Sequence, residues 1–125
     1  MNKNQKWLVF WLTFTFFVIG MFYFFYGSNT TPGMYDDFAK CLTSNGVKMY
    51  GSFQCPHCAD QKVLFGDSIK YVDYVECGPL TGPEAQVCKD ANIVGYPTWK
   101  IGGSYVKGTQ TLQDLAKYSN CKLPS

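Results

Sequence analysis

Apolar residues follow two different patterns along the chain: one long run near the N-terminus, then a series of short segments. The run, residues 7–26, contains no charged residue and is interrupted only by Thr13, Thr15 and Gly20. At roughly 1.5 Å per residue, a helix of this length crosses a hydrocarbon core of about 30 Å. We therefore expect residues 7–26 to form a transmembrane signal anchor.

A cleavable signal peptide and a buried core helix are the alternative interpretations of this run. For cleavage after Ser28, a small residue should stand where the chain has Tyr26, and a signal peptide has a shorter apolar region. A core helix would not be apolar on every face. Lys3 and Lys6 precede the run without any acid, so the positive-inside tendency predicts a cytoplasmic N-terminus, residues 1–6, and an extracytoplasmic remainder.

The segments after the run predict a tether and one folded domain. Residues 27–34 are rich in Gly, Ser, Thr and Pro and predict a flexible tether. From residue 35 the apolar spacing alternates between helical and extended. We expect Asp36 or Asp37 to cap a first helix that runs to about 44, followed by a strand over 47–51, a helix from 55 to about 66 and a buried strand over 71–75. A short helix over 83–91, strands over 98–101 and 104–107 around Gly102-Gly103, and a helix over 111–118 complete the domain.

This order of elements predicts an α/β domain over residues 35–125. Two strands separated by a helix should lie parallel with a right-handed crossover, and the later hairpin should add an antiparallel edge. Charge changes the picture little: the net charge of +2 comes from Lys3 and Lys6, since nine lysines and nine acids balance beyond residue 26. With no basic face, we expect no nucleic-acid partner.

Candidate chemistry lies in Cys55-Pro56-His57-Cys58, between the first strand and the second helix of the domain. Cys55 is expected at the helix start, where free N–H groups and the helix dipole favour an anion such as a thiolate. Pro56 suits the first helical turn. We expect Cys55 to be the attacking thiol, His57 to stabilise its thiolate when protonated, and Cys58 to close a redox-active disulfide with Cys55.

Zinc sites use the same Cys-x-x-Cys spacing, and an inert structural disulfide is a further alternative. The sequence has no second Cys-x-x-Cys, and His57 within the pair is poorly placed for shared chelation. Disulfides at helix starts tend to be strained and exchangeable. We therefore expect redox chemistry, no metal and no cofactor.

The other four cysteines can pair in three ways. Cys77 and Cys88 bound a single surface excursion, so their closure is the easiest to build, and Cys41 with Cys121 would then tie the first helix of the domain to its end. An even count outside the cytoplasm favours structural disulfides. A buried free thiol at Cys41 and a second redox relay at Cys77 and Cys88 are the alternatives.

Four short segments carry a resemblance to a known family: residues 48–51, 55–58, 74–77 and 95–99. They resemble the thioredoxin-like domain associated with bacterial vitamin K epoxide reductase homologues, and the Pro-His pair between the cysteines is that of the DsbA family. The resemblance implies a thioredoxin-like fold, a cis Pro97 against the cysteines, and pairing of the Tyr96 backbone with an extended substrate segment. The alternative for Tyr96-Pro97 is an ordinary turn.

Two positions depart from the thioredoxin pattern that the chain resembles. Gln54, after Phe53, replaces the tryptophan that usually precedes the first cysteine, so we expect an altered substrate platform at Phe53 and Gln54. Met49 stands six residues before Cys55, where thioredoxin has a buried acid that helps to move the proton of the second thiol. The group that deprotonates Cys58 is therefore unassigned by the sequence.

The resulting hypothesis is a membrane-anchored, extracytoplasmic thiol–disulfide oxidoreductase that acts on protein thiols. Oxidation is the expected direction, because a stabilised Cys55 thiolate favours the reduced form, Pro-His lies between the cysteines, and Met49 stands where the acid is missing. For reoxidation, the resemblance implies a quinone-linked membrane partner similar to vitamin K epoxide reductase or DsbB. A reductase or isomerase of the same fold is an alternative. A tethered peptide-binding module with purely structural cysteines is another.

Overall fold

The computed structural model describes residues 1–26 and 33–125, which belong to two separate units. The first unit contains α1 (Lys3–Tyr26), whose side chains are all exposed. By length and composition α1 could cross a membrane, a criterion that a signal sequence also meets. The expected tether, residues 27–34, lies outside the described residues except for its last two.

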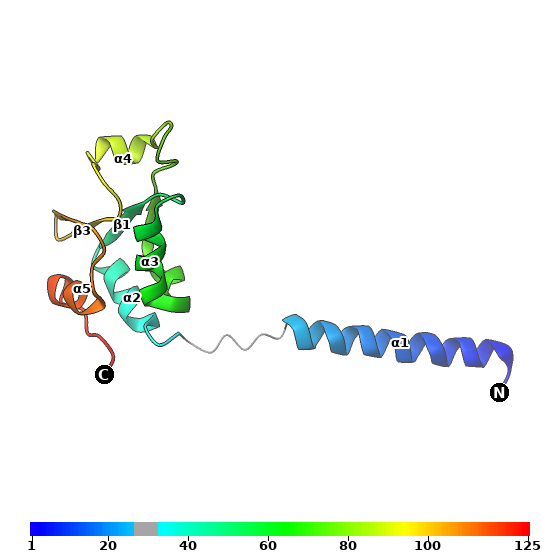
Figure 1. The fold of residues 1–125 in the computed structure, drawn as a ribbon. Coiled ribbons are helices and arrows are strands. Elements are labelled where there is room, and N and C mark those ends of the chain that lie inside the picture. Colours follow the sequence, from blue (N-terminus) through cyan, green and yellow to red (C-terminus); the bar gives the residue numbers. More distant parts are fainter. Residues whose placement is uncertain (27–32) are drawn as a thin grey trace. The chain divides into compact units, whose positions relative to one another are not determined.

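The second unit is an α/β domain with one mixed sheet (Figure 1). Its elements are α2 (Asp36–Ser44), β1 (Lys48–Gly51), α3 (Pro56–Phe65), the 3₁₀ helix η1 (Gly66–Tyr71), β2 (Asp73–Glu76), α4 (Gln86–Asp90), β3 (Thr98–Ile101), β4 (Ser104–Lys107) and α5 (Leu112–Ser119). The strand order is β2-β1-β3-β4, with β1 parallel to β2 and the other pairs antiparallel. This architecture confirms the predicted fold class.

Each face of the sheet carries an apolar cluster, because successive side chains of a strand point to opposite faces. Met49 belongs to the larger cluster and its neighbour Tyr50 to the smaller one. The larger cluster draws on α2, α3, β3 and α5, and the Phe65 ring lies 6.1 Å from both the Phe38 and the Trp99 ring. In Figure 1, α4 lies at the opposite end of the domain from α2 and α5.

The β3–β4 hairpin has the predicted bounds. Gly102 and Gly103 both have positive φ angles, 55° and 84°, as the two central residues of a type I′ turn require. Glycine adopts such angles without steric cost. The Gly-Gly pair therefore explains both the position of the turn and the pairing of Ile101 with Ser104.

The expectation that Asp36 or Asp37 caps α2 is wrong. Tyr35 is the N-cap residue, and no side chain caps this helix end. The buried Asp36 carboxylate instead accepts hydrogen bonds from the Gly33 N–H (3.0 Å) and the Ser68 hydroxyl (2.8 Å). Because Ser68 lies in η1, this contact fastens the start of α2 to a helix that the sequence pattern did not predict.

Two other predicted elements differ from the structure. The second strand begins at Asp73 instead of residue 71, because residues 66–71 form η1. This strand, β2, lies at the edge of the sheet and is only partly buried, whereas a buried strand was predicted. The predicted helix over residues 83–91 is shorter, Gln86–Asp90. Glu84 lies before this helix, where its carboxylate accepts a hydrogen bond from the Tyr96 hydroxyl at 3.0 Å.

Candidate active site

Cys55 and Cys58 lie together at the start of α3. Cys55 is the N-cap residue, with Pro56 in the first turn, and its sulfur accepts a hydrogen bond from the Cys58 N–H at 3.3 Å. Both cysteines are free thiols and are buried, with 7% and 1% of their surfaces exposed. The structure therefore places a dithiol at a helix N-terminus, a position that in general favours negative charge.

The loop before β3 covers the Cys55 sulfur. The Tyr96–Pro97 peptide bond is cis, Pro97 is buried, and the Tyr96 carbonyl accepts a hydrogen bond from the Cys55 thiol at 3.7 Å. Burial and the hydrogen bond to Glu84 raise the pKa of the Tyr96 hydroxyl to about 12. The Tyr96 side chain is therefore tied to the segment just before α4.

The remaining predicted site residues surround the dithiol on the surface. Phe53 is 67% exposed, and Gln54 accepts a hydrogen bond from the Leu80 N–H at 3.0 Å. His57 is exposed, and its carbonyl accepts a hydrogen bond from the Thr109 hydroxyl at 3.4 Å. The structure thus brings Phe53, Gln54 and His57 beside the cysteines, with Gln54 attaching a neighbouring loop.

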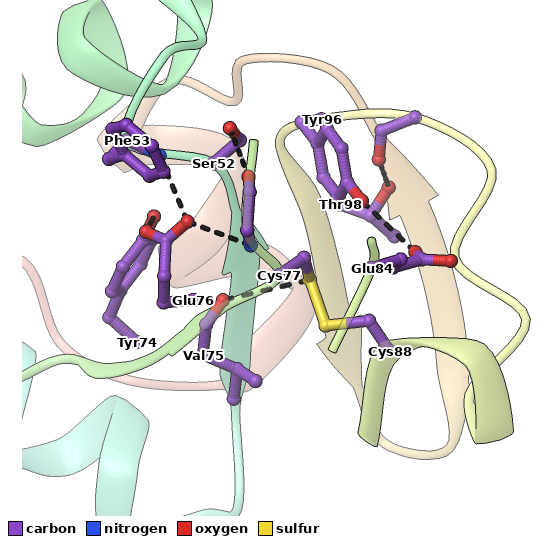
Figure 2. Close-up of a disulfide and its surroundings, with 12 residues drawn as sticks. Ser52, Phe53, Tyr74, Val75, Glu76, Cys77, Glu84, Cys88, Tyr96 and Thr98 are labelled. Atoms are coloured by element: carbon purple, nitrogen blue, oxygen red, sulfur yellow. Dashed lines mark hydrogen bonds between the residues drawn. A yellow bond between two sulfur atoms is a disulfide. The ribbon is translucent and has the colours of Figure 1, made fainter. Parts of the chain in front are cut away.

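That loop is the segment between Cys77 and Cys88, which a disulfide closes (Figure 2). The Cys77 N–H donates to the Gly51 carbonyl at 2.8 Å, and the Ser52 hydroxyl donates to the Gly78 carbonyl at 2.6 Å. The loop is therefore fastened to the backbone just before Cys55. A second disulfide, Cys41–Cys121, joins α2 to the chain after α5 and lies away from this loop in sequence.

Sequence reasoning missed Tyr74 and Glu76, which lie on the Cys58 side of β2. In the parallel register Tyr74 is beside Met49, and Glu76 is beside Gly51. The Tyr74 hydroxyl donates to the Glu76 carboxylate at 2.6 Å. The i, i+2 spacing could have placed both side chains on one face, but only the strand register shows which face that is.

The environment shifts the titration of this group of residues. Burial is the largest cause of the raised pKa of the Cys58 thiol, followed by its hydrogen bond to Cys55. Burial and the hydrogen bond to Glu76 raise the pKa of Tyr74. Burial opposes ionisation of Glu76, but hydrogen bonds from Tyr74 and two backbone N–H groups outweigh it and lower the pKa of this carboxyl.

No group of three or more metal-ligating side chains occurs in the part of the chain that the structure describes. The dithiol itself has only two sulfur ligands, whereas a structural zinc site is usually four-coordinate. The arrangement can support thiol–disulfide exchange, because two free thiols lie together at the start of α3.

The sheet order and the dithiol at the start of α3 define a thioredoxin-like domain. No protein-family model matches the chain. Among known proteins, it is similar to the thiol-disulfide oxidoreductase LTO1 of Arabidopsis thaliana, with 42% identity over 90 residues. The match covers 68% of this chain but only 24% of that protein. The similarity supports a thioredoxin-like redox family.

Proposed function

We propose that this chain is a thiol–disulfide oxidoreductase that exchanges disulfides with proteins through Cys55 and Cys58. The observation that carries the proposal is the Cys58 N–H directed at the Cys55 sulfur from the first turn of α3. A hydrogen bond to a thiolate stabilises it, and the thiolate is the nucleophile in disulfide exchange. The similarity to a thiol-disulfide oxidoreductase supports the same chemistry.

In the proposed oxidation, a substrate thiolate attacks Cys55 in the Cys55–Cys58 disulfide and releases the Cys58 thiolate, which takes up a proton. The second thiol of the substrate loses its proton and attacks the mixed disulfide. The substrate then contains the disulfide. The enzyme has gained two electrons from the substrate and contains the reduced dithiol. The exposed Phe53 and the Tyr96 backbone flank Cys55, where an extended substrate segment would lie.

The proposed direction is oxidation, because a stabilised thiolate favours the reduced enzyme and makes its disulfide a good oxidant. A quinone-linked membrane protein similar to vitamin K epoxide reductase or DsbB would reoxidise the dithiol. We propose that residues 7–26 anchor the chain in the cell membrane, with residues 1–6 cytoplasmic and 35–125 extracytoplasmic. The anchor would raise the effective concentration of the domain near such a partner.

Single substitutions test the activity itself. In a disulfide-exchange assay with a reduced protein substrate, Cys55→Ser and Cys58→Ser should each abolish turnover, because neither variant can form the Cys55–Cys58 disulfide that the substrate thiolate attacks. His57→Ala should retain turnover at a reduced rate. Full turnover in both serine variants would show that the protein is a binding module with structural cysteines.

A redox titration tests the direction. The purified protein is equilibrated with glutathione buffers, and its dithiol fraction is compared with that of thioredoxin. Thioredoxin has a reduction potential of about −270 mV. We expect the potential of this protein to be higher, that is, more oxidising. A potential at or below the thioredoxin value would instead favour the reductase or isomerase.

A further inference from the structure

When the dithiol is reoxidised, Cys58 must lose a proton to attack the mixed disulfide that Cys55 forms with the oxidant. Yet Cys58 is among the most buried residues of the domain. Its side chain is 1% exposed. Met49, which belongs to the same apolar cluster, is fully buried and can accept no proton. Another group must therefore connect the Cys58 thiol with solvent.

Gly51 brings one such group to Cys58. A Cβ atom on Gly51 would lie 3.0 Å from the Cys58 sulfur, 3.0 Å from the Tyr74 hydroxyl oxygen and 2.8 Å from the Tyr74 ring. The Cys58 sulfur and the Tyr74 hydroxyl oxygen therefore both border the space that a Cβ on Gly51 would occupy, which we call the Gly51 space. With any larger residue at position 51, a side chain would fill the space that they share.

The Tyr74 hydroxyl is also bonded to a group that reaches solvent. It donates to Glu76 Oε2 at 2.6 Å, while Glu76 Oε1 accepts the N–H groups of Phe53 and Gly78, each at 3.0 Å. Figure 2 shows Tyr74 and Glu76 side by side, with Phe53 above them. These hydrogen bonds fix the carboxylate in place. Because Glu76 is exposed, the carboxylate is still open to water.

Other charged or titratable groups near Cys58 come from α3 and from the loop before β3. Lys62 lies with its Nζ 3.7 Å from the centre of the Tyr74 ring, and its positive charge favours both the Cys58 thiolate and the Glu76 carboxylate. Cys55 and Tyr96 face the same region. Of these groups, the Tyr74 hydroxyl is the one held against the Gly51 space and hydrogen-bonded to a carboxylate.

We propose that Tyr74 and Glu76 form a proton-transfer pair that carries the Cys58 proton to and from solvent. The inference rests on the proposed function. When Cys55 holds a mixed disulfide, the Cys58 thiol gives its proton to the Tyr74 oxygen while Tyr74 gives its own proton to Glu76. The Cys58 thiolate then forms the bond to the Cys55 sulfur, the partner sulfur leaves as a thiolate, and Glu76 releases its proton to water.

The test measures the reaction of Cys55 and the reaction of Cys58 as two kinetic phases of one experiment. The full chain is reduced in detergent and mixed with excess 5,5′-dithiobis(2-nitrobenzoate) in a stopped-flow instrument. Attack by Cys55 releases one nitrothiobenzoate at a rate that depends on reagent concentration. Attack by Cys58 on the resulting mixed disulfide releases a second nitrothiobenzoate, and the rate of this step does not depend on reagent concentration. The variants are Tyr74→Phe, Glu76→Gln and the pair combined, with Tyr105→Phe as the matched control on β4.

We expect Tyr74→Phe and Glu76→Gln each to slow the second phase by about 100-fold, since a positioned acid–base group contributes at least about this much. The first phase should stay within about twofold of the wild-type rate, which also reports that each variant is folded. The combined variant should be no slower than Tyr74→Phe, and the pH dependence of the second phase should change in all three. Tyr105→Phe should match the wild type in both phases.

The inference is overturned if the second phase is unchanged in both single variants, or if both phases slow equally, as a structural role would require. If Tyr74→Phe fails to fold, Glu76→Gln decides alone, because a glutamine oxygen can still accept the Phe53 and Gly78 N–H groups. A wild-type protein without a second phase would overturn the proposed function together with the inference. A normal wild-type trace with unaffected variants would overturn the inference only.

Discussion

Gly51 has too little space around it for a side chain. We expect Gly51→Ala to destabilise the domain, because its Cβ would lie 2.8 Å from the Tyr74 ring and 3.0 Å from the Cys58 sulfur. Overpacking of this kind typically costs about 1–3 kcal/mol, which urea denaturation would measure. Gly95→Ala is the control, since a Cβ there meets nothing within 4 Å. Equal stability of the two variants would contradict this account of Gly51.

Glu76 should make the stability of the domain depend on pH. Its folded-state pKa is lowered from the ordinary 4.5, so the unfolded chain binds its proton more readily. The contribution of Glu76 is therefore complete above 4.5 and is lost as the pH falls through the folded-state value. The difference in unfolding free energy between wild type and Glu76→Gln should shrink from neutral pH to about pH 3. Asp60→Asn is the control, and a difference that grows in acid would contradict the assignment.

At this scale, sequence reasoning found the residues whose chemistry is visible in a motif. Cys55 and Cys58 stand out by their spacing and by Pro56 at a helix start. Tyr74 and Glu76 do not, because their relation to Cys58 arises from the parallel register of β1 and β2. A strand register depends on packing across the sheet, which local patterns do not encode.

At the scale of elements, helices and strands with their own boundary signals were predicted well. The Gly102-Gly103 turn fixed the hairpin, and Thr111, whose hydroxyl accepts the Asp114 N–H at 3.0 Å, begins α5 as an N-cap. η1 was missed because it depends on the contact of Ser68 with Asp36, residues far apart in sequence. α4 was predicted too long because Glu84 bonds to Tyr96 instead of starting the helix.

The two disulfides between elements should differ in their effect on stability. Cys41–Cys121 spans 80 residues, whereas Cys77–Cys88 spans 11. In the loop-entropy view, removing them would cost roughly 4 and roughly 3 kcal/mol. Double alanine variants at each pair, compared by urea denaturation, would measure this order. A larger loss for Cys77→Ala/Cys88→Ala would show that the shorter loop stabilises the domain mainly through its contacts with Ser52 and Gly51.

At the scale of the whole molecule, folding and exchange chemistry should not depend on α1. Both apolar clusters, with the side chains packed on them, draw on residues 35–123 alone, and 33–125 belong to a unit of their own. We expect a fragment of residues 33–125 to unfold cooperatively at the same midpoint as this unit in the full chain. Its first nitrothiobenzoate phase should match that of the full chain. A fragment without a cooperative transition would show that α1 is required for folding.

The anchor should matter only where a membrane partner takes part. Two proteins held in one membrane meet at an effective concentration that can reach the millimolar range for short flexible links. With membranes from the source cells and oxygen, the full chain should therefore be reoxidised at least about tenfold faster than fragment 33–125 at micromolar concentration. Glutathione disulfide should reoxidise both at equal rates, because it needs no membrane. Equal rates with membranes would mean that α1 does not serve reoxidation, and a cleaved signal sequence would then explain this helix better.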